Sequence, residues 1–222
     1  MIAETPLTQT ALDALLGLSD DVLKDPIVLQ DGSRVLLTSS KETISALGSI
    51  LRIDNHIVRV LHMSIVDFFT TPSRCTDERL FINRSKHNGE LASRCFKTMK
   101  ALLRRDICRI NDPTKLNVEV PDLGKRFERY LPEHLRYACR FWHRHLPNVD
   151  RGNDVGLHKQ AKDFLFTHLL HWIEVMSLIG DIEGVFTALE AVNGWFQVSL
   201  QKPRVIYLLR DNVAVVSSSS CK

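Results

Sequence analysis

The strongest constraint on the fold is the helical spacing of apolar residues in the second half of the chain. From about residue 86 onward these residues recur at intervals of three and four, a period typical of helices that bury one face. The first apolar stripe consists of Leu91, Cys95, Met99 and Leu102. Further helices are predicted over residues 123–130, 132–146, 157–179 and 181–195. We therefore expect an α-helical bundle over 84–200, with 201–222 as a frayed or truncated tail.

The helix predicted over residues 132–146 is the best defined of these. Proline at its first position and Glu133 in its first turn are typical of a helix start. One face of this helix is apolar and consists of Leu135, Cys139, Trp142 and Leu146. The most apolar stretch of the whole chain, residues 164–179, is interpreted as a buried helix because it is shorter than a bilayer span.

The first part of the chain, residues 1–83, predicts a small α+β module. Helical patterns begin at Pro6, Ser19 and Thr43, and two short strands are predicted at 50–53 and 57–61 around the turn Asp54-Asn55. Three helices followed by a β-ribbon is the order of a winged helix. The fold class expected is therefore mainly α, with a winged-helix-like module followed by the helical bundle.

Residues 25–41 interrupt the helical pattern of this module. Joining Lys24 directly to Glu42 would give one continuous amphipathic helix. The segment itself indicates a turn and a strand, because it contains Pro26 and Asp31-Gly32. We interpret 25–41 as a suspected insertion, which is either a genuine surface hairpin or the product of a retained intron or an error in the gene structure.

Composition and charge exclude several classes of protein. Hydrophobic residues at 44% and charged residues at 25% are typical of a globular domain. The five cysteines include no C-x-x-C pair, which argues against zinc ribbons and disulfide frameworks and indicates reduced, partly buried thiols. The N-terminus lacks the pattern of a secretory signal. We expect a cytoplasmic protein with no membrane contact.

No motif for nucleotide binding or catalysis occurs in the sequence. The patterns G-x-x-x-x-G-K-[ST], G-x-G-x-x-G, H-E-x-x-H and G-x-S-x-G are missing. His143 and His145 would point about 200° apart on a helix. His168 and His171, three residues apart, have no acidic or cysteine partner at i+4. Cys139 falls in the predicted apolar face and is interpreted as a packing residue. We therefore expect no catalytic residue, no metal and no cofactor.

Charge is unevenly distributed along the chain. The net charge is −4 over residues 1–83, +8 over 84–145 and −4 over 146–199. The helix predicted from residue 86 has a basic side formed by Arg94, Lys97, Lys100 and Arg104. Such a side is often simply solvated, and the alternatives are docking on an acidic protein surface or binding nucleic acid through residues 94–109. Nucleic acid is the weaker alternative, because the net negative charge of the N-terminal module opposes phosphate contact.

Three blocks of sequence occur here in an order known from one protein family. The first is Leu61-His-Met-Ser-Ile-Val-Asp-Phe-Phe, followed by Thr71-Pro-Ser-Arg-Cys and Phe81-Ile. The second is Leu91-Ala-Ser-Arg-Cys-Phe-Lys-Thr-Met with Leu103-Arg-Arg-Asp-Ile-Cys, and the third runs from Leu135-Arg-Tyr-Ala-Cys-Arg-Phe-Trp to Leu169-Leu-His-Trp-Ile-Glu-Val-Met. These blocks resemble the LHxSFxDFL…DPSRC…FFID region and the adjoining C-terminal segment of fungal NACHT-type STAND NTPases, which are NOD-like receptors related to heterokaryon-incompatibility proteins.

The resemblance spans most of residues 6–196, and it also has clear departures. The opening residues 6–22 are similar to the helix pair PLS…ALLGLSDDDV of that family. Ile65 stands where the family usually has phenylalanine, and residues 25–41 have no counterpart. The P-loop and the acidic magnesium motif, which precede this region in the family, are absent. The resemblance thus implies the winged-helix and helical part of a switch ATPase without its nucleotide-binding domain.

Several residue roles are implied by the resemblance. In the family this region packs against the nucleotide-binding domain, and a nearby histidine can sense the bound diphosphate. His62 is the loosely matching histidine, and closing the wing onto the next helix is its alternative, structural role. A buried joint between the modules 1–83 and 84–200 is expected to consist of Leu61, Ile65, Phe68 and Phe69. Further candidate interaction or interdomain residues are Arg94, Lys97, Arg104 and Trp142.

The function that we expect is that of a non-catalytic regulatory or interaction region. Its partner would be a NACHT nucleotide-binding domain or an acidic protein surface. Two alternatives remain open at this point: a winged-helix nucleic-acid-binding module that uses the basic 94–109 helix, and a non-functional gene fragment.

Overall fold

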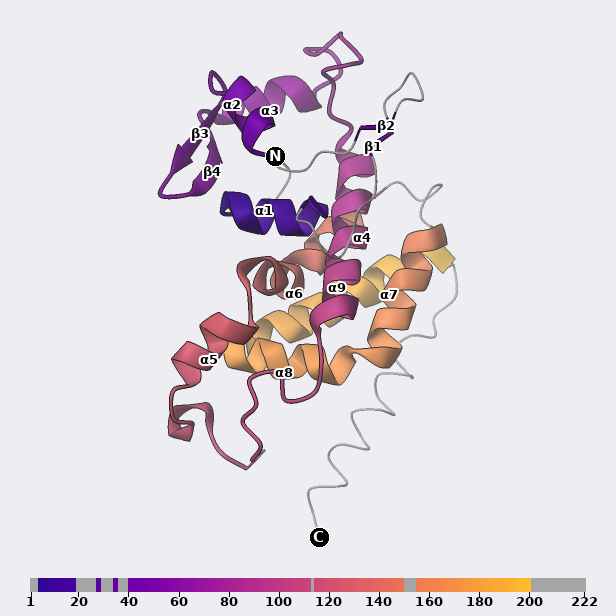
Figure 1. The fold of residues 1–222 in the computed structure, drawn as a ribbon. Helices are drawn as coiled ribbons and strands as arrows, with labels where there is room; N and C mark the ends of the chain where they lie inside the picture. The colour runs from indigo at the N-terminus through magenta and orange to yellow at the C-terminus, as the bar shows by residue number, and fades with distance from the viewer. Residues whose placement is uncertain are drawn as a thin grey trace.

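The computed structural model describes residues 4–18, 27–28, 34–35, 40–112, 114–149 and 155–200, and these residues are mainly helical (Figure 1). The first elements are α1 (Gln9–Leu16), β1 (Ile27–Val28), β2 (Arg34–Val35), α2 (Lys41–Ala46), β3 (Leu51–Asp54), β4 (Ile57–Val60) and α3 (Met63–Thr70). The later elements are α4 (Arg84–Leu102), α5 (Leu123–Tyr130), α6 (Glu133–His145), α7 (Val155–Thr167), α8 (Leu169–Ile179) and α9 (Ile182–Leu200). The predicted mainly helical fold is confirmed. The helix predicted at Ser19 and the tail 201–222 lie outside the described residues.

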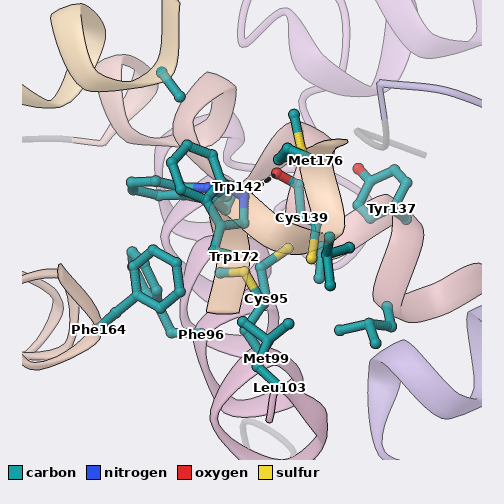
Figure 2. Close-up of a cluster of buried hydrophobic side chains, with 14 of the residues drawn as sticks. Cys95, Phe96, Met99, Leu103, Tyr137, Cys139, Trp142, Phe164, Trp172 and Met176 are labelled. Carbon is teal, nitrogen blue, oxygen red and sulfur yellow. Dashed lines mark hydrogen bonds between the residues drawn. The ribbon is translucent and has the colours of Figure 1, made fainter. Parts of the chain in front are cut away.

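The hydrophobic core lies where α4, α6, α7, α8 and α9 pack together. Trp142 is completely buried at its centre, and its ring lies 5.2 Å from Phe96, 5.2 Å from Phe164 and 5.8 Å from Trp172, centroid to centroid. Figure 2 shows these rings together, with Trp172 Nε1 donating a hydrogen bond of 2.9 Å to the Cys139 carbonyl oxygen. Each buried ring of this size contributes about 1.5–3 kcal/mol, so this cluster is the main source of stability in the bundle.

The apolar face predicted for the helix over 132–146 is confirmed. Its members Leu135, Cys139, Trp142 and Leu146 are all 0% exposed. The same burial corrects the assignment of Trp142 as an interaction residue. Because its ring is enclosed by other side chains of the bundle, Trp142 offers nothing to a partner and acts only in packing.

Helix α1 packs onto the bundle although it belongs to the first 83 residues. Leu7, Ala11 and Leu15 are buried in the same hydrophobic core as α4 and α6. Thr8 is the N-cap of α1, and its side chain accepts a hydrogen bond from the Ala11 N–H. Glu133, in the first turn of α6, accepts hydrogen bonds from both the Thr8 hydroxyl (2.5 Å) and the Thr8 N–H (3.2 Å). The core therefore continues across residue 83, and the division into two modules there stays a prediction.

The β-ribbon predicted in the first module is present as the antiparallel pair β3–β4. Leu51 pairs with Val60 and Asp54 with Ile57, close to the predicted bounds. The turn lies one residue later than predicted, at Asn55-His56, whose φ angles of 48° and 66° are those of a tight hairpin turn. Residues 7–9 extend this ribbon, since the Val58 N–H donates to Leu7 O (2.9 Å) and the Gln9 N–H to His56 O (3.1 Å).

The suspected insertion 25–41 contains a short antiparallel pair. Ile27 pairs with Val35 and Val28 with Arg34, and α2 begins at its last residue, Lys41. Extended structure is thus present in the segment, where the sequence predicted a turn and a strand. Whether the segment is an insertion stays a prediction.

Two helix predictions are wrong in their extent. The helix from residue 86 ends at Leu102, so residues 103–109 are not part of a basic helix. The reason is tertiary: Glu174 of α8 accepts the backbone N–H groups of Asp106 and Ile107, both at 3.1 Å, and so replaces the helical carbonyls as their acceptor. The helix predicted over 157–179 is two helices, α7 and α8, which are separated at His168 by a change in backbone direction (φ −124°, ψ 1°).

A chain of buried polar groups links α4, α6 and the N-terminal residues. His145 is 0% exposed; its Nδ1 lies 2.9 Å from Asn88 Oδ1 and its Nε2 lies 3.0 Å from the Tyr137 hydroxyl. Because Asn88 Oδ1 can only accept, Nδ1 carries the proton and Nε2 accepts from Tyr137. The Tyr137 oxygen in turn accepts from the Glu4 N–H at 3.1 Å. Burial lowers the pKa of His145 to about 4, so the ring is neutral at pH 7.

Candidate interaction surface

Helix α3 carries the first of the family-like sequence blocks, and it begins at His62. His62 is the N-cap residue: its Nδ1 accepts a hydrogen bond from the Ser64 N–H at 3.1 Å. The ring is exposed, and His62 lies two residues after the end of β4 at Val60. His62 thus has the structural role of joining the ribbon to the next helix, while nucleotide sensing by this residue stays a prediction.

The prediction of a buried joint in α3 is wrong. Leu61 and Phe68 are 48% and 40% exposed, Ile65 and Phe69 are half-buried, and α3 contains no fully buried residue. The physical reason is the length of the helix. Eight residues offer one face to β4 of the ribbon, and the apolar side chains on the other faces meet water.

The half-buried side of α3 lines an open groove of about 550 Å³. The residues that line the groove come from α1, α2, the β3–β4 sheet, α3 and the first half of α4. Its walls are mostly apolar and include Leu12, Ile44, Val58, Ile65, Phe69 and Leu91. Charged groups at the groove come from Arg59, Arg79, Glu90 and Arg94. Of the predicted site residues, this groove brings together Ile65, Phe69 and Arg94.

The rest of the first block folds back and holds α3. Arg74 forms an ion pair with Asp67 of α3, and the N–H groups of Arg74 and Cys75 both donate to Thr71 O at 3.0 Å. The Ile82 N–H donates to Phe69 O at 2.8 Å. The polar groups of the block therefore stabilise its local structure, and its exposed apolar side chains are available for contact with a partner.

The predicted basic side of α4 is not one surface. Arg94 is half-buried and donates to Leu16 O at the end of α1. Arg94 and Lys97 both line a hollow of about 490 Å³ beside α7, with Glu90 and Gln160. Arg104 lies beyond the end of α4, with its guanidinium 5.9 Å from the centre of the Tyr130 ring in α5. The prediction that Arg94, Lys97 and Arg104 share one helix face is therefore wrong.

A second basic group, which the sequence did not identify, surrounds Tyr130. The guanidinium groups of Arg104, Arg109 and Arg129 lie 5.9, 5.2 and 5.4 Å from the centre of this ring. Arg126 joins them, because its Nη1 donates to the Arg109 carbonyl oxygen at 2.6 Å. A signal was present in the two basic runs at 104–109 and 125–129, but spacing alone could not show that these runs fold together.

The four cysteines among the described residues are buried, as the sequence indicated, and Cys221 lies outside those residues. Cys75, Cys95, Cys108 and Cys139 are buried free thiols, and burial raises the pKa of Cys95 and Cys139, whereas a reactive thiol needs a lowered pKa. Among the described residues, no group of three or more His, Cys, Asp and Glu side chains is arranged to hold a metal ion. In the same part of the chain, every helix is too short or too polar to cross a bilayer.

Comparison of the chain with protein-family models, with curated proteins and with solved structures found no match. The family resemblance therefore depends on the sequence blocks alone.

Proposed function

We propose that this chain is a non-catalytic regulatory or interaction region that corresponds to the part of a NACHT-type STAND NTPase following the nucleotide-binding domain. In this proposal α2, β3 and β4 supply a helix and the wing of a winged-helix-like unit, and α4 to α9 form the helical part that comes next. The partner is a NACHT nucleotide-binding domain. The chain itself carries out no reaction and transmits the nucleotide state of that domain.

The observation that carries this proposal is the exposure of apolar side chains on the helix with the family-like block. Leu61, Met63 and Phe68 are 48%, 72% and 40% exposed, and they lie within eight consecutive residues. Gathered exposed apolar groups are typical of protein interaction sites. In the family that the block resembles, this region packs against the nucleotide-binding domain, so such groups at this place fit the proposed partner.

The groove beside α3 supports the same proposal. Its apolar wall continues from Ile65 and Phe69 towards α1 and α2, so a partner that covered both the exposed and the half-buried sides of α3 would also bury this wall. His62, exposed at the start of α3, lies next to that contact area. In the proposed complex His62 is the residue that faces the bound nucleotide diphosphate.

The test is binding of the full 222-residue chain to a separately expressed, ADP-loaded NACHT domain of a fungal STAND NTPase. Serine at Leu61 and Phe68 (Leu61→Ser with Phe68→Ser) should weaken binding at least tenfold, because both side chains are exposed and belong to the proposed contact. The matched control is Val118→Ser with Phe186→Ser, which changes two apolar side chains that are 91% and 64% exposed elsewhere. This control should change the affinity less than twofold.

Two results would contradict the proposal. One is the absence of saturable binding to the NACHT domain. The other is equal weakening by the α3 variant and by the control, which would indicate non-specific hydrophobic association. A salt-dependent mobility shift with duplex DNA, together with no binding to the NACHT domain, would favour the nucleic-acid alternative.

A further inference from the structure

The arginines around Tyr130 differ from most other described arginines in their partners. Elsewhere, a carboxylate lies close to each of six guanidinium groups, those of Arg52, Arg74, Arg79, Arg136, Arg140 and Arg144. Within the described part of the chain, no salt bridge is formed by Arg104, Arg105, Arg109, Arg126 or Arg129. We call Tyr130 and the four arginines close to it, Arg104, Arg109, Arg126 and Arg129, the Tyr130 arginine cluster. Among the described residues, no ion pair balances the positive charge of these four arginines.

Two acidic groups at the loop after α4 hold backbone N–H groups. The Asp106 carboxylate accepts the N–H groups of Ile110 (2.5 Å) and Asn111 (3.0 Å). Glu174 accepts those of Asp106 and Ile107. Both carboxylates therefore fix the loop after α4 in shape, and neither forms an ion pair with the cluster.

The guanidinium groups are held in place before any ligand binds. Arg109 has a left-handed backbone (φ 54°), and its N–H donates to Asp106 O at 2.8 Å. Its carbonyl accepts the side chain of Arg126 at 2.6 Å. Contact with the Tyr130 ring further restricts Arg104, Arg109 and Arg129. Groups ordered in advance lose less entropy when they bind an anion.

Most of the cluster lines an open hollow of about 390 Å³ on the protein surface. Arg109, Lys125, Arg126 and Arg129 line it together with Tyr130 and Asn111. This volume is in the range of small-molecule sites. Lys125 forms an ion pair with Asp122 at 3.4 Å, which leaves Arg109, Arg126 and Arg129 as the cations of the hollow without a carboxylate partner. Their planar guanidinium donors match the spacing of phosphate oxygens, and three such groups favour a ligand with several negative charges.

We propose that the Tyr130 arginine cluster binds a compact anion with several phosphate groups, such as a triphosphate or an inositol polyphosphate. A small ligand fits better than a nucleic acid, because Arg109, Arg126 and Arg129 line one hollow. The exposed acids Asp122, at the N-cap of α5, and Glu128, in α5, would also repel an extended phosphate backbone. This site is independent of the NACHT partner proposed above, and either proposal can fail without the other.

Calorimetric titration of the full chain at about 0.15 M salt tests the proposal. The probes are inositol hexakisphosphate, inorganic triphosphate, ATP and orthophosphate. We expect saturable binding with one ligand per chain, at least tenfold tighter for triphosphate than for orthophosphate. Equal affinity for ATP and triphosphate would support recognition of the phosphate groups alone. Tighter binding of inositol hexakisphosphate than of triphosphate would identify an inositol polyphosphate as the preferred ligand.

Paired variants separate the site from general charge attraction. Arg109→Gln with Arg129→Gln should weaken triphosphate binding at least tenfold. The control Arg52→Gln with Arg79→Gln removes the same charge from arginines that have carboxylate partners, and it should weaken binding less than twofold. The single reversal Arg129→Glu, at an exposed position of α5, gives a second readout if the double variant is unstable, and it should also weaken binding tenfold or more.

Three outcomes would overturn the proposal. The first is no saturable binding of any polyphosphate, and the second is equal loss in the cluster variant and its control. The third is tighter binding of a 20-base-pair DNA than of inositol hexakisphosphate, abolished by the same variant, which would assign the cluster to nucleic acid.

Discussion

The buried chain from Asn88 through His145 to Tyr137 predicts that the protein loses stability between pH 7 and pH 5. Burial lowers the pKa of His145 to about 4 in the folded state, whereas an exposed histidine has a pKa of about 6.5. Below pH 6.5, therefore, His145 is protonated in the unfolded chain but stays neutral in the folded chain. The contribution of His145 to the free energy of unfolding is fully present above pH 6.5 and is lost as the pH falls towards 4.

The size of the loss can be worked out from the difference between the two pKa values. One histidine with these values reduces the free energy of unfolding by about 2 kcal/mol between pH 7 and pH 5. Burial also lowers the pKa of the neighbouring His143 to about 4, so His143 adds to the effect. The two rings interact, so they titrate as a coupled pair.

Urea unfolding at pH 7, 6 and 5 measures this effect. His145→Gln should be less stable than the wild type at pH 7, because it loses buried hydrogen bonds, yet it should lose about 2 kcal/mol less on going to pH 5. The control His56→Asn changes an exposed histidine with a positive φ, which asparagine tolerates, and should keep the wild-type pH dependence. In the wild type, the ring protons of His145 should titrate with a midpoint of about 4 by NMR. A midpoint near 6.5, or an unchanged pH dependence in His145→Gln, would contradict this prediction.

Two further pairs of variants test the packing and the backbone by urea unfolding. Phe68→Ala should cost less than about 1.5 kcal/mol, because the ring is 40% exposed, whereas Phe96→Ala in the bundle core should cost about 3–5 kcal/mol; equal costs would show that α3 is buried after all. Gly180→Ala should destabilise the protein by about 1 kcal/mol, because Gly180 ends α8 with a φ of 78°. Gly124→Ala in α5, where an added Cβ meets nothing within 4 Å, should instead stabilise it by about 0.5–1 kcal/mol, and a loss of stability there would count against the expected helix propensity effect.

Where sequence signals were local, they placed the elements well. The helix over 123–130 has the predicted bounds, and Pro132 and Glu133 marked the start of α6. The strand pair around Asn55 was visible because β-branched residues flank a turn residue. In each case the residues that decide the structure are neighbours in the chain.

Where distant residues decide the structure, sequence reasoning failed. Arg104 and Arg105 are good helix formers, and only contacts with Glu174, about 70 residues later in the chain, explain why α4 stops before them. No glycine or proline marks the break at His168.

The candidate site shows the same division. The residues of α3 could be named from the family-like block, but their exposure could not. An apolar run such as Met63–Thr70 predicts a buried helix. How much of the helix is actually covered depends on the elements that surround it in the tertiary structure. The Tyr130 arginine cluster likewise depends on a loop and a helix that meet only after folding.

The start of α1 has a mechanical consequence. Residues 7–9 are hydrogen-bonded to the ribbon through Val58 and His56, while Thr8 is also bonded to Glu133 at the start of α6. Any displacement of the ribbon relative to the bundle must therefore strain or break these few bonds. A partner that shifted the ribbon would be detected first as faster amide hydrogen exchange at Gln9 and Val58, ahead of any change in the aromatic core.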